Sequence, residues 1–354
     1  MSLLEVRNLR VHLHVPFGVA RAVDGVDLAV EEGESVGIVG ESGSGKSLLA
    51  LSILGLLPKG HFELPAGGSV KFRGEEVLRA DESRLREIRG GEIAMVFQEP
   101  LTSLNPVLTV GDQVGEAVWI HRRIDRRQAP EVAAGLLRDV GIPDAEGRLG
   151  AFPHQLSGGM RQRAMIAMAL AGQPSLLVAD EPTTALDVTI QAQILAMLKA
   201  LREKQGMALL LISHDLRVVA QLCQTVFVMY AGRIVETGPA SKVLTRPKHP
   251  YTRGLLGSRL SIRDRRSRLR PIPGEVPEAT SWPTGCRFHP RCSEAVLRCR
   301  TEEPSLDEMD PDGPEVGPTA SSAASTGVGA RPQSLPQRRR ARCWFPGEEG
   351  DGGV

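Results

Sequence analysis

The chain has 354 residues, enough for two to three domain-sized units with a substantial hydrophobic core. A net charge of +1 and an aromatic content of 4% argue against nucleic acid as a partner, because neither a strong positive field nor a base-stacking surface is present. No apolar run approaches the ~18 residues of a membrane-spanning helix, and residues 1–10 lack the apolar core of a targeting signal. We therefore expect a cytosolic protein that reaches a membrane only by docking to a partner.

Residues 3–30 alternate between apolar and polar side chains in three stretches, 4–7, 11–15 and 22–28. This alternation predicts antiparallel strands with one solvated face. Phe17 lies in a turn between them. Its ring could stack on a nucleotide base or fill a hydrophobic gap, and both roles stay open.

The sequence G-E-S-G-S-G-K-S at 40–47 follows a strand-like apolar run at 35–39 and precedes a helix-like run at 48–54. It matches the P-loop pattern G-x-x-x-x-G-K-[ST], and this context disfavours a chance glycine-rich turn. The glycines let backbone N–H groups point at phosphate oxygens, the lysine adds charge for the β- and γ-phosphates, and the last serine can ligate Mg²⁺. The predicted phosphate-binding residues are Gly40, Ser42, Gly43, Ser44, Gly45, Lys46 and Ser47.

Beyond this loop the sequence shows two different secondary-structure patterns. Between 99 and 156 two helical patterns, 111–122 and 129–140, indicate a helical insertion of roughly 55–60 residues. From 157 to about 236 strands and helices alternate, which predicts an α/β fold with a mostly parallel sheet covered on both faces.

Two further stretches contain candidate catalytic or ligand-binding residues. The apolar strand at 176–179 ends in Asp180 and Glu181, where Asp180 would hold Mg²⁺ and Glu181 would act as general base toward water. Ser157, Gly158 and Gly159 open a long helix and form a second anion-binding terminus. Because one nucleotide cannot readily use both termini of a single chain, we expect a dimer in which this helix caps the γ-phosphate on the partner's P-loop.

The ordered set of a P-loop, Gln98, L-S-G-G at 156–159, Asp180-Glu181, A-L-D at 185–187 and His214 resembles the ATP-binding cassette (ABC) ATPases over residues 3 to about 240. The resemblance implies a P-loop NTPase cassette with an antiparallel β subdomain and a helical subdomain at about 99–156. It implies a head-to-tail dimer with two ATP molecules, tied together by Asp187. Gln98 would contact Mg²⁺ or the attacking water, and His214 would contact the γ-phosphate and hold Glu181 in register.

The run F-Q-E-P-L-T-S-L-N-P at 97–106 and the segments 156–170 and 179–195 resemble the peptide and nickel importer ATPases, specifically the first, or D-type, of their two ATPase subunits. This implies a translocase ATPase on the cytoplasmic face of the cell membrane. Its partners would be two transmembrane permeases, a second ABC ATPase in a heterodimer and an extracytoplasmic solute-binding protein. Uptake of di- or oligopeptides is the expected function. A nickel or other small-solute importer, or a non-transport ABC ATPase, are the alternatives.

H-P-Y-T at 249–252 and G-C-R-F-H-P-R-C at 285–292 resemble the tail of the same group. Cys286, Cys292, Cys299 and Cys343 are spaced by five, six and 43 residues, which is not a zinc-ribbon spacing. In a cytosolic protein such cysteines favour metal over disulfides, and the resemblance suggests a [4Fe–4S] cluster. A zinc site or no metal remain alternatives.

The expected units are 1–240 for the ATPase domain, 241–310 for the cysteine-containing extension, 311–340 for a disordered low-complexity segment and 341–354 for a tail that carries Cys343. Six arginines between 259 and 270 favour a solvated linker over a nucleic-acid or lipid contact.

Overall fold

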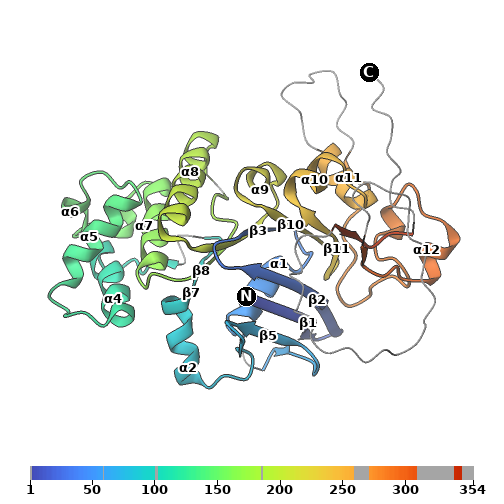
Figure 1. The fold of residues 1–354 in the computed structure, drawn as a ribbon, viewed down its shortest axis with the longest axis horizontal. Helices are drawn as coiled ribbons and strands as arrows, with labels where there is room; N and C mark the ends of the chain where they lie inside the picture. The colour runs from blue at the N-terminus through green and yellow to red at the C-terminus, as the bar shows by residue number, and fades with distance from the viewer. Residues whose placement is uncertain are drawn as a thin grey trace, which may run out of the picture.

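The computed structural model describes residues 2–58, 60–99, 103–184, 186–258, 271–308 and 339–344. Figure 1 shows a central sheet with helices above it, a smaller N-terminal sheet below it, a helical part at one end and the C-terminal extension at the other. The stretch at 259–270 and most of the low-complexity segment lie outside the described residues.

The N-terminal sheet is antiparallel, with the order β2-β1-β5-β6 and β4 also paired with β1. The sequence predicted two strands at 4–7 and 11–15, but the structure joins them into one. Asn8 adopts a left-handed φ of 44°, and register shifts on either side of Leu9 let the strand continue through a bulge. The strands are β1 Ser2–Val15, β2 Gly18–Glu31, β4 Phe62–Glu63, β5 Ser69–Phe72 and β6 Glu75–Glu76.

The central sheet has the order β12-β13-β11-β10-β3-β9-β8-β7 among the described residues. Neighbours from β10 to β7 run parallel, and β11, β13 and β12 complete one edge in antiparallel pairs. The expectation of a mostly parallel core is confirmed. Its strands are β3 Ser35–Val39, β7 Ile93–Val96, β8 Leu176–Asp180, β9 Ala208–Ser213, β10 Thr225–Tyr230, β11 Arg233–Pro239, β12 Asp307–Glu308 and β13 Arg340–Ala341.

Helices cover the central sheet, and α4 to α7 build the helical part at the far end from the C-terminal extension (Figure 1). Thr109 caps α4 by accepting a hydrogen bond from the N–H of Asp112, and Gly206 closes α8 with a left-handed φ of 65°. The α-helices are α1 Lys46–Ile53, α2 Glu82–Glu87, α4 Val110–Arg122, α5 Ala129–Asp139, α6 Ala145–Arg148, α7 Gly158–Leu170, α8 Val188–Gln205, α9 Leu216–Leu222, α10 Ala240–Thr245, α11 Pro250–Gly257 and α12 Leu297–Thr301. Short π- or 3-10-helical turns lie at Ile88–Glu92, Pro153–Gln155 and His289–Arg291.

Two hydrophobic cores lie on opposite faces of the central sheet. Leu176 and Val178 belong to the core shared with α1 and the N-terminal sheet, whereas Leu177 and Ala179 belong to the core under the helices. This period-2 alternation of buried side chains is why these strands are apolar throughout. No helix among the described residues has both the length and the apolar character needed to cross a bilayer.

The C-terminal segment 339–344 returns to the central sheet. Arg340 and Ala341 pair with β11 on one side and with β12 on the other. Residues 309–338 fall outside the described part, but Arg339 and Arg340, which were expected to be disordered, are ordered: Arg340 pairs with the sheet edge, and Arg339 directly precedes it. A guanidinium nitrogen of Arg339 also donates to the fully buried carboxylate of Glu236 at 2.9 Å.

Candidate nucleotide-binding site

The predicted catalytic residues meet at the carboxyl ends of the central strands. The neighbouring strands β3, β9, β8 and β7 are parallel, so their carboxyl ends lie along the same side of the sheet. Gly40 follows β3, His214 follows β9, Glu181 follows β8 and Gln98 lies just beyond β7. The carboxyl edge of such a sheet is where ligands bind in α/β proteins.

The loop at 40–47 needs glycine for steric reasons. Gly45 has a φ of 102°, and a Cβ there would lie 2.2 Å from the carbonyl oxygen of Ala22. At Gly40 a Cβ would lie 2.1 Å from the carbonyl oxygen of Met229. The backbone of 40–47 therefore passes too close to its neighbours for any side chain at these two positions.

Lys46 begins α1, and its ammonium group folds back over the loop. Nζ donates to the carbonyl oxygens of Gly40 at 2.9 Å and Glu41 at 2.8 Å. Burial lowers the pKa of Lys46, while the carboxylates of Glu181, Asp180 and Glu41 oppose that shift. A positive charge and a helix N-terminus thus converge on the same loop, which suits a phosphate.

Asp180, the last residue of β8, supplies the acidic side of the site. Its side chain is buried, Oδ1 has no hydrogen-bond partner among the described residues, and the Ser47 hydroxyl lies close to its carboxylate. Burial raises the pKa of Asp180. A buried carboxylate oxygen without a partner, next to a serine hydroxyl, fits the oxygen ligands that Mg²⁺ prefers.

Glu181 is surrounded by three polar side chains. Its Oε2 lies 3.1 Å from Nδ1 of His214, 3.3 Å from Nε2 of Gln98 and 2.8 Å from Oγ1 of Thr184. Glu181 adopts a left-handed φ of 47°, and its N–H donates to the carbonyl oxygen of Ile212 in β9 at 2.9 Å. The structure thus brings together all three predicted catalytic residues. It adds Thr184, which the sequence analysis did not single out although it stands within the segment 179–195.

The L-S-G-G turn at 156–159 lies apart from the loop at 40–47, which we call the phosphate loop. Ser157 caps α7 by accepting a hydrogen bond from the N–H of Met160 at 3.3 Å, and Asp187 caps α8 in the same way with Ile190 at 2.9 Å. A Cβ on Gly159 would lie 2.9 Å from the Ile190 side chain, so the two helix starts are adjacent. Figure 1 shows α7 with the helical part and α1 beneath the central sheet. Ser157, Gly158 and Gly159 therefore do not join the phosphate loop of their own chain.

Phe17 stands at the turn between β1 and β2. Its side chain is 95% exposed, so it does not fill a hydrophobic gap in the chain. Stacking on a base stays the prediction for this ring.

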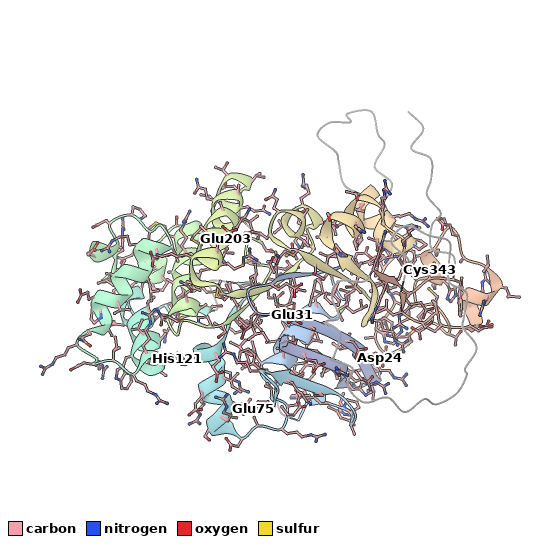
Figure 2. All side chains as sticks on the ribbon, in the orientation of Figure 1. Asp24, Glu31, Glu75, His121, Glu203 and Cys343 are labelled. Carbon is pink, nitrogen blue, oxygen red and sulfur yellow. The ribbon has the colours of Figure 1, made fainter. Side chains whose placement is uncertain are left out.

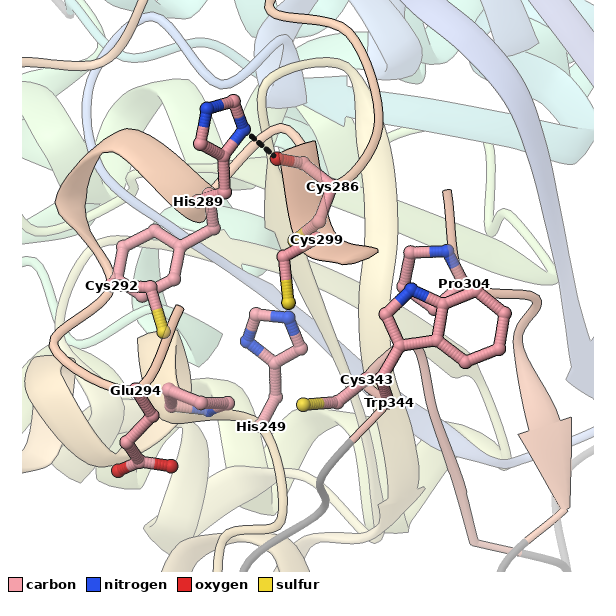
Figure 3. Close-up of a pocket in the computed structure, with 11 residues that line it drawn as sticks. His249, Cys286, His289, Cys292, Glu294, Cys299, Pro304, Cys343 and Trp344 are labelled. Carbon is pink, nitrogen blue, oxygen red and sulfur yellow. Dashed lines mark hydrogen bonds between the residues drawn. The ribbon is translucent and has the colours of Figure 1, made fainter. Parts of the chain in front are cut away.

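The four C-terminal cysteines line one mostly apolar cavity with His249 at its wall (Figure 3). The N–H of Cys286 donates to the carbonyl oxygen of Cys299 at 2.9 Å, and Cys286, Cys292 and Cys299 are not in disulfides. Burial raises the pKa of Cys286 to about 11 and that of Cys292 above its ordinary value. Among the described residues, no group of three or more His, Cys, Asp or Glu side chains is arranged to hold a metal ion. The fifth cysteine, Cys223, is a buried core residue, and burial raises its pKa to about 12.

Comparison with known proteins identifies the family. The ABC transporter family matches residues 23–184, and the oligopeptide/dipeptide transporter C-terminal region matches residues 235–299. A probable peptide ABC transporter ATP-binding protein of Sinorhizobium fredii is 54% identical to the chain over 87% of this chain and 92% of the relative. The chain belongs to the ABC transporter ATPases. A putative peptide import ATP-binding protein of Brucella melitensis is 51% identical over 87% of this chain and 94% of the relative.

Solved structures agree with this family. The chain resembles a dimeric post-hydrolysis state of an ATP-binding cassette bound to ADP and Pi, with a TM-score of 0.60 and 28% identity over 67% of this chain and 98% of that one. It also resembles cbiO1 from Clostridium perfringens, part of an ABC transporter complex, with a TM-score of 0.58 and 27% identity over 68% of this chain and 90% of that one. The ABC ATPase therefore has the P-loop NTPase cassette fold predicted from its sequence, and its activity is ATP hydrolysis.

Proposed function

We propose that this ABC ATPase energises the import of di- or oligopeptides through partner permeases. Two observations support the substrate class: the relatives are named for peptide import, and the matched C-terminal region is that of oligopeptide/dipeptide transporters. The observation that carries the activity is the convergence of His214, Gln98 and Thr184 on one oxygen of Glu181, beside the phosphate loop.

In the proposed mechanism the N–H groups of 43–47 and Lys46 hold the phosphates of ATP. Ser47 and Asp180 would hold Mg²⁺, which would neutralise phosphate charge when bound. Glu181 accepts a proton from the water that attacks the γ-phosphate. His214 and Gln98 keep the Glu181 carboxylate oriented, and the His214 side chain, which is 54% exposed, remains accessible to the γ-phosphate. Phe17 supplies a platform for the base.

The proposed active form is a head-to-tail heterodimer with a second ABC ATPase. It is supported by the separation of Ser157–Gly159 from the phosphate loop of the same chain, because each turn can then cap the nucleotide on the other subunit. Asp187, next to that turn, would link the two sites. The remaining proposed partners are two permeases and an extracytoplasmic solute-binding protein, with the ATPase bound peripherally at the cytoplasmic face of the cell membrane.

For the C-terminal extension we propose a [4Fe–4S] cluster held by Cys286, Cys292, Cys299 and Cys343. Four thiols around one mostly apolar cavity match the ligand number and type of such a cluster, although they are not arranged for a single metal ion. When bound, the cluster would supply a covalent cross-link between the 286–299 loop and the terminal segment. The test is iron and acid-labile sulfide analysis of anaerobically purified protein, with Cys292→Ser as the variant. Absence of both iron and sulfide, or an equimolar zinc content, would contradict the assignment.

The importer function is tested by purifying the tagged protein from detergent-solubilised membranes and identifying what accompanies it. Two permeases, a second ATPase and ATP hydrolysis stimulated by peptide with its binding protein are expected. Stimulation by nickel instead of peptide would change the substrate class, and co-purification of ribosomes or DNA-repair factors would contradict transport. The catalytic assignment is tested separately in the purified protein with Glu181→Gln.

A further inference from the structure

The cysteine extension reaches the phosphate loop through Arg291. This residue ends the 3-10 turn His289–Arg291 and immediately precedes Cys292. Its side chain is only 4% exposed. Nη1 lies 2.7 Å from Oε2 of Glu41 and Nη2 lies 3.0 Å from Oε1, so the guanidinium binds the carboxylate through two parallel hydrogen bonds.

Arg291 also fixes the chain on its other side. Nε donates to the carbonyl oxygen of Pro273 at 2.8 Å, and Nη2 donates to that of Gly274 at 3.1 Å. The segment 274–279 lines a groove together with residues 41–43 of the phosphate loop. One buried guanidinium therefore holds both walls of this groove.

The backbone of Glu41 is held by the extension as well. Its N–H donates to the hydroxyl oxygen of Tyr251 at 2.8 Å. Tyr251 is fully buried, and its ring packs against the rings of Tyr230 and Phe288, with centroids 4.6 and 5.4 Å away. Side chain and backbone of this one loop residue thus both depend on residues more than 200 positions away.

The charge of Glu41 explains why such a contact matters. Glu41 is the only acidic residue within 40–47, and its carboxylate acts to raise the pKa of the neighbouring Lys46. A triphosphate is strongly anionic, so an unpaired carboxylate in this loop would repel it and compete for the lysine ammonium. The Arg291 guanidinium neutralises that carboxylate and points it away into the extension.

We propose that Arg291 is a positioning residue of the ATP site, which fixes and neutralises Glu41 so that the phosphate loop binds the triphosphate. The proposal rests on residues 40–47 being the ATP site. It makes the cysteine extension part of the nucleotide site rather than a separate appendage, and it gives the cysteine cavity a direct mechanical route to the loop through the peptide bond between Arg291 and Cys292.

The test measures the Kd of a non-hydrolysable ATP analogue and of inorganic tripolyphosphate for the full chain, both with Mg²⁺. Arg291→Ala should raise both Kd values about tenfold, which corresponds to ~1.4 kcal/mol. Adding Glu41→Gln in the same chain should recover most of the loss, because it removes the unpaired charge. A merely structural role would not produce this recovery.

The matched control is Arg298→Ala, which removes an exposed ion pair with Glu302 in the same extension and should leave both Kd values unchanged. If Arg291→Ala does not fold by circular dichroism, Arg291→Gln, which loses the charge and keeps a long polar side chain, is measured with and without Glu41→Gln. Three outcomes would each overturn the proposal. The Arg291 variant could keep the Kd values of the parent, Glu41→Gln could bring no recovery, or the variant could bind the ATP analogue more weakly while its Kd for tripolyphosphate is unchanged. Failure of the parent chain to bind ATP would instead contradict the nucleotide site itself.

Discussion

The hydroxyl of Thr184 donates a hydrogen bond of 2.8 Å to Oε2 of Glu181. The same oxygen lies 3.1 Å from His214 and 3.3 Å from Gln98. Because these three contacts converge on Oε2, we expect Oε1 to be the oxygen that faces the attacking water. The left-handed φ of Glu181 sets the direction of the carboxylate, and strained backbone of this kind is maintained by its surroundings.

Glu181→Gln should abolish hydrolysis and retain ATP binding. The amide keeps the shape of the side chain and cannot accept a proton, so we expect kcat to fall by roughly 10²–10⁴-fold. Phosphate release and equilibrium binding of ATP are measured on the same preparation. Hydrolysis at near parental rates would show that another group acts as the base.

Thr184→Val should lower kcat several-fold with little change in KM. Valine has the shape of threonine without the hydroxyl, so Glu181 loses one of its three partners while packing is kept, a loss of about 1 kcal/mol. Thr184→Ser, which restores a hydroxyl, should recover most of the rate in a steady-state assay. Equal losses in the valine and serine variants would mean that the methyl group matters and the hydrogen bond does not.

The local part of the site was predictable because it lies in contiguous sequence. The phosphate loop, Asp180-Glu181 and His214 each follow an apolar strand, and parallel pairing then places them on one edge. The pairing of Glu41 with Arg291 was not predictable, because no periodicity links two residues 250 positions apart. The ordered strand at Arg340–Ala341 was missed for the same reason: its stability comes from β11 and not from its own arginine-rich sequence.

Lys46→Ala and Ser157→Arg should separate the two parts of the proposed two-chain ATP site, which are the loop at 40–47 of one chain and the turn at 157–159 of the other. Lys46→Ala removes the ammonium group that we propose contacts the phosphates, so the isolated chain should lose ATP binding. Ser157→Arg should block the turn that we propose caps the partner's nucleotide, so the isolated chain should still bind ATP with parental affinity. The Ser157→Arg variant should no longer associate with the partner ATPase when ATP is added. This association is measured by size-exclusion chromatography in the Glu181→Gln background. Loss of ATP binding by the isolated Ser157→Arg chain would contradict the two-chain arrangement.

Asp24→Asn should change how stability depends on pH. Asp24 is buried near the junction of the N-terminal sheet with the extension (Figure 2), and it accepts hydrogen bonds from Arg233 and Arg287. Burial acts to raise the pKa of Asp24, but the two arginines outweigh it and hold the pKa below its ordinary value of 3.8. The ionised pair therefore stabilises the fold above about pH 4 and is lost as the pH falls through the lower, folded-state pKa.

In urea unfolding, Asp24→Asn should cost about 3 kcal/mol at pH 7, because it leaves the buried Arg287 without its carboxylate and leaves Arg233 with Glu303 as its remaining ion-pair partner. Its difference from the parent should shrink as the pH is lowered below 4. Asp139→Asn, which removes an exposed pair with Lys204, is the control and should cost less than ~1 kcal/mol. A difference that stays constant from pH 7 to pH 3 would contradict the assigned pKa direction.

Glu236→Gln should loosen the terminal segment that carries Cys343. The fully buried Glu236 carboxylate accepts hydrogen bonds from the N–H groups of Lys248 and His249 and from Arg339. Glutamine keeps the shape and loses the charge, so the buried Arg339 is left without an anionic partner, at a cost of about 3 kcal/mol or more. Arg339 and Cys343 belong to one short segment paired with β11, and Cys343 lines the cysteine cavity. The substitution should therefore destabilise the part of the cavity wall that this segment forms.

Thiol labelling of the metal-free protein by a maleimide should then become faster at Cys286 and Cys299, as quantified by peptide mass spectrometry. The exposed substitution Glu302→Gln should leave labelling unchanged, and equal rates in the parent and Glu236→Gln would show that the terminal segment does not close the cavity.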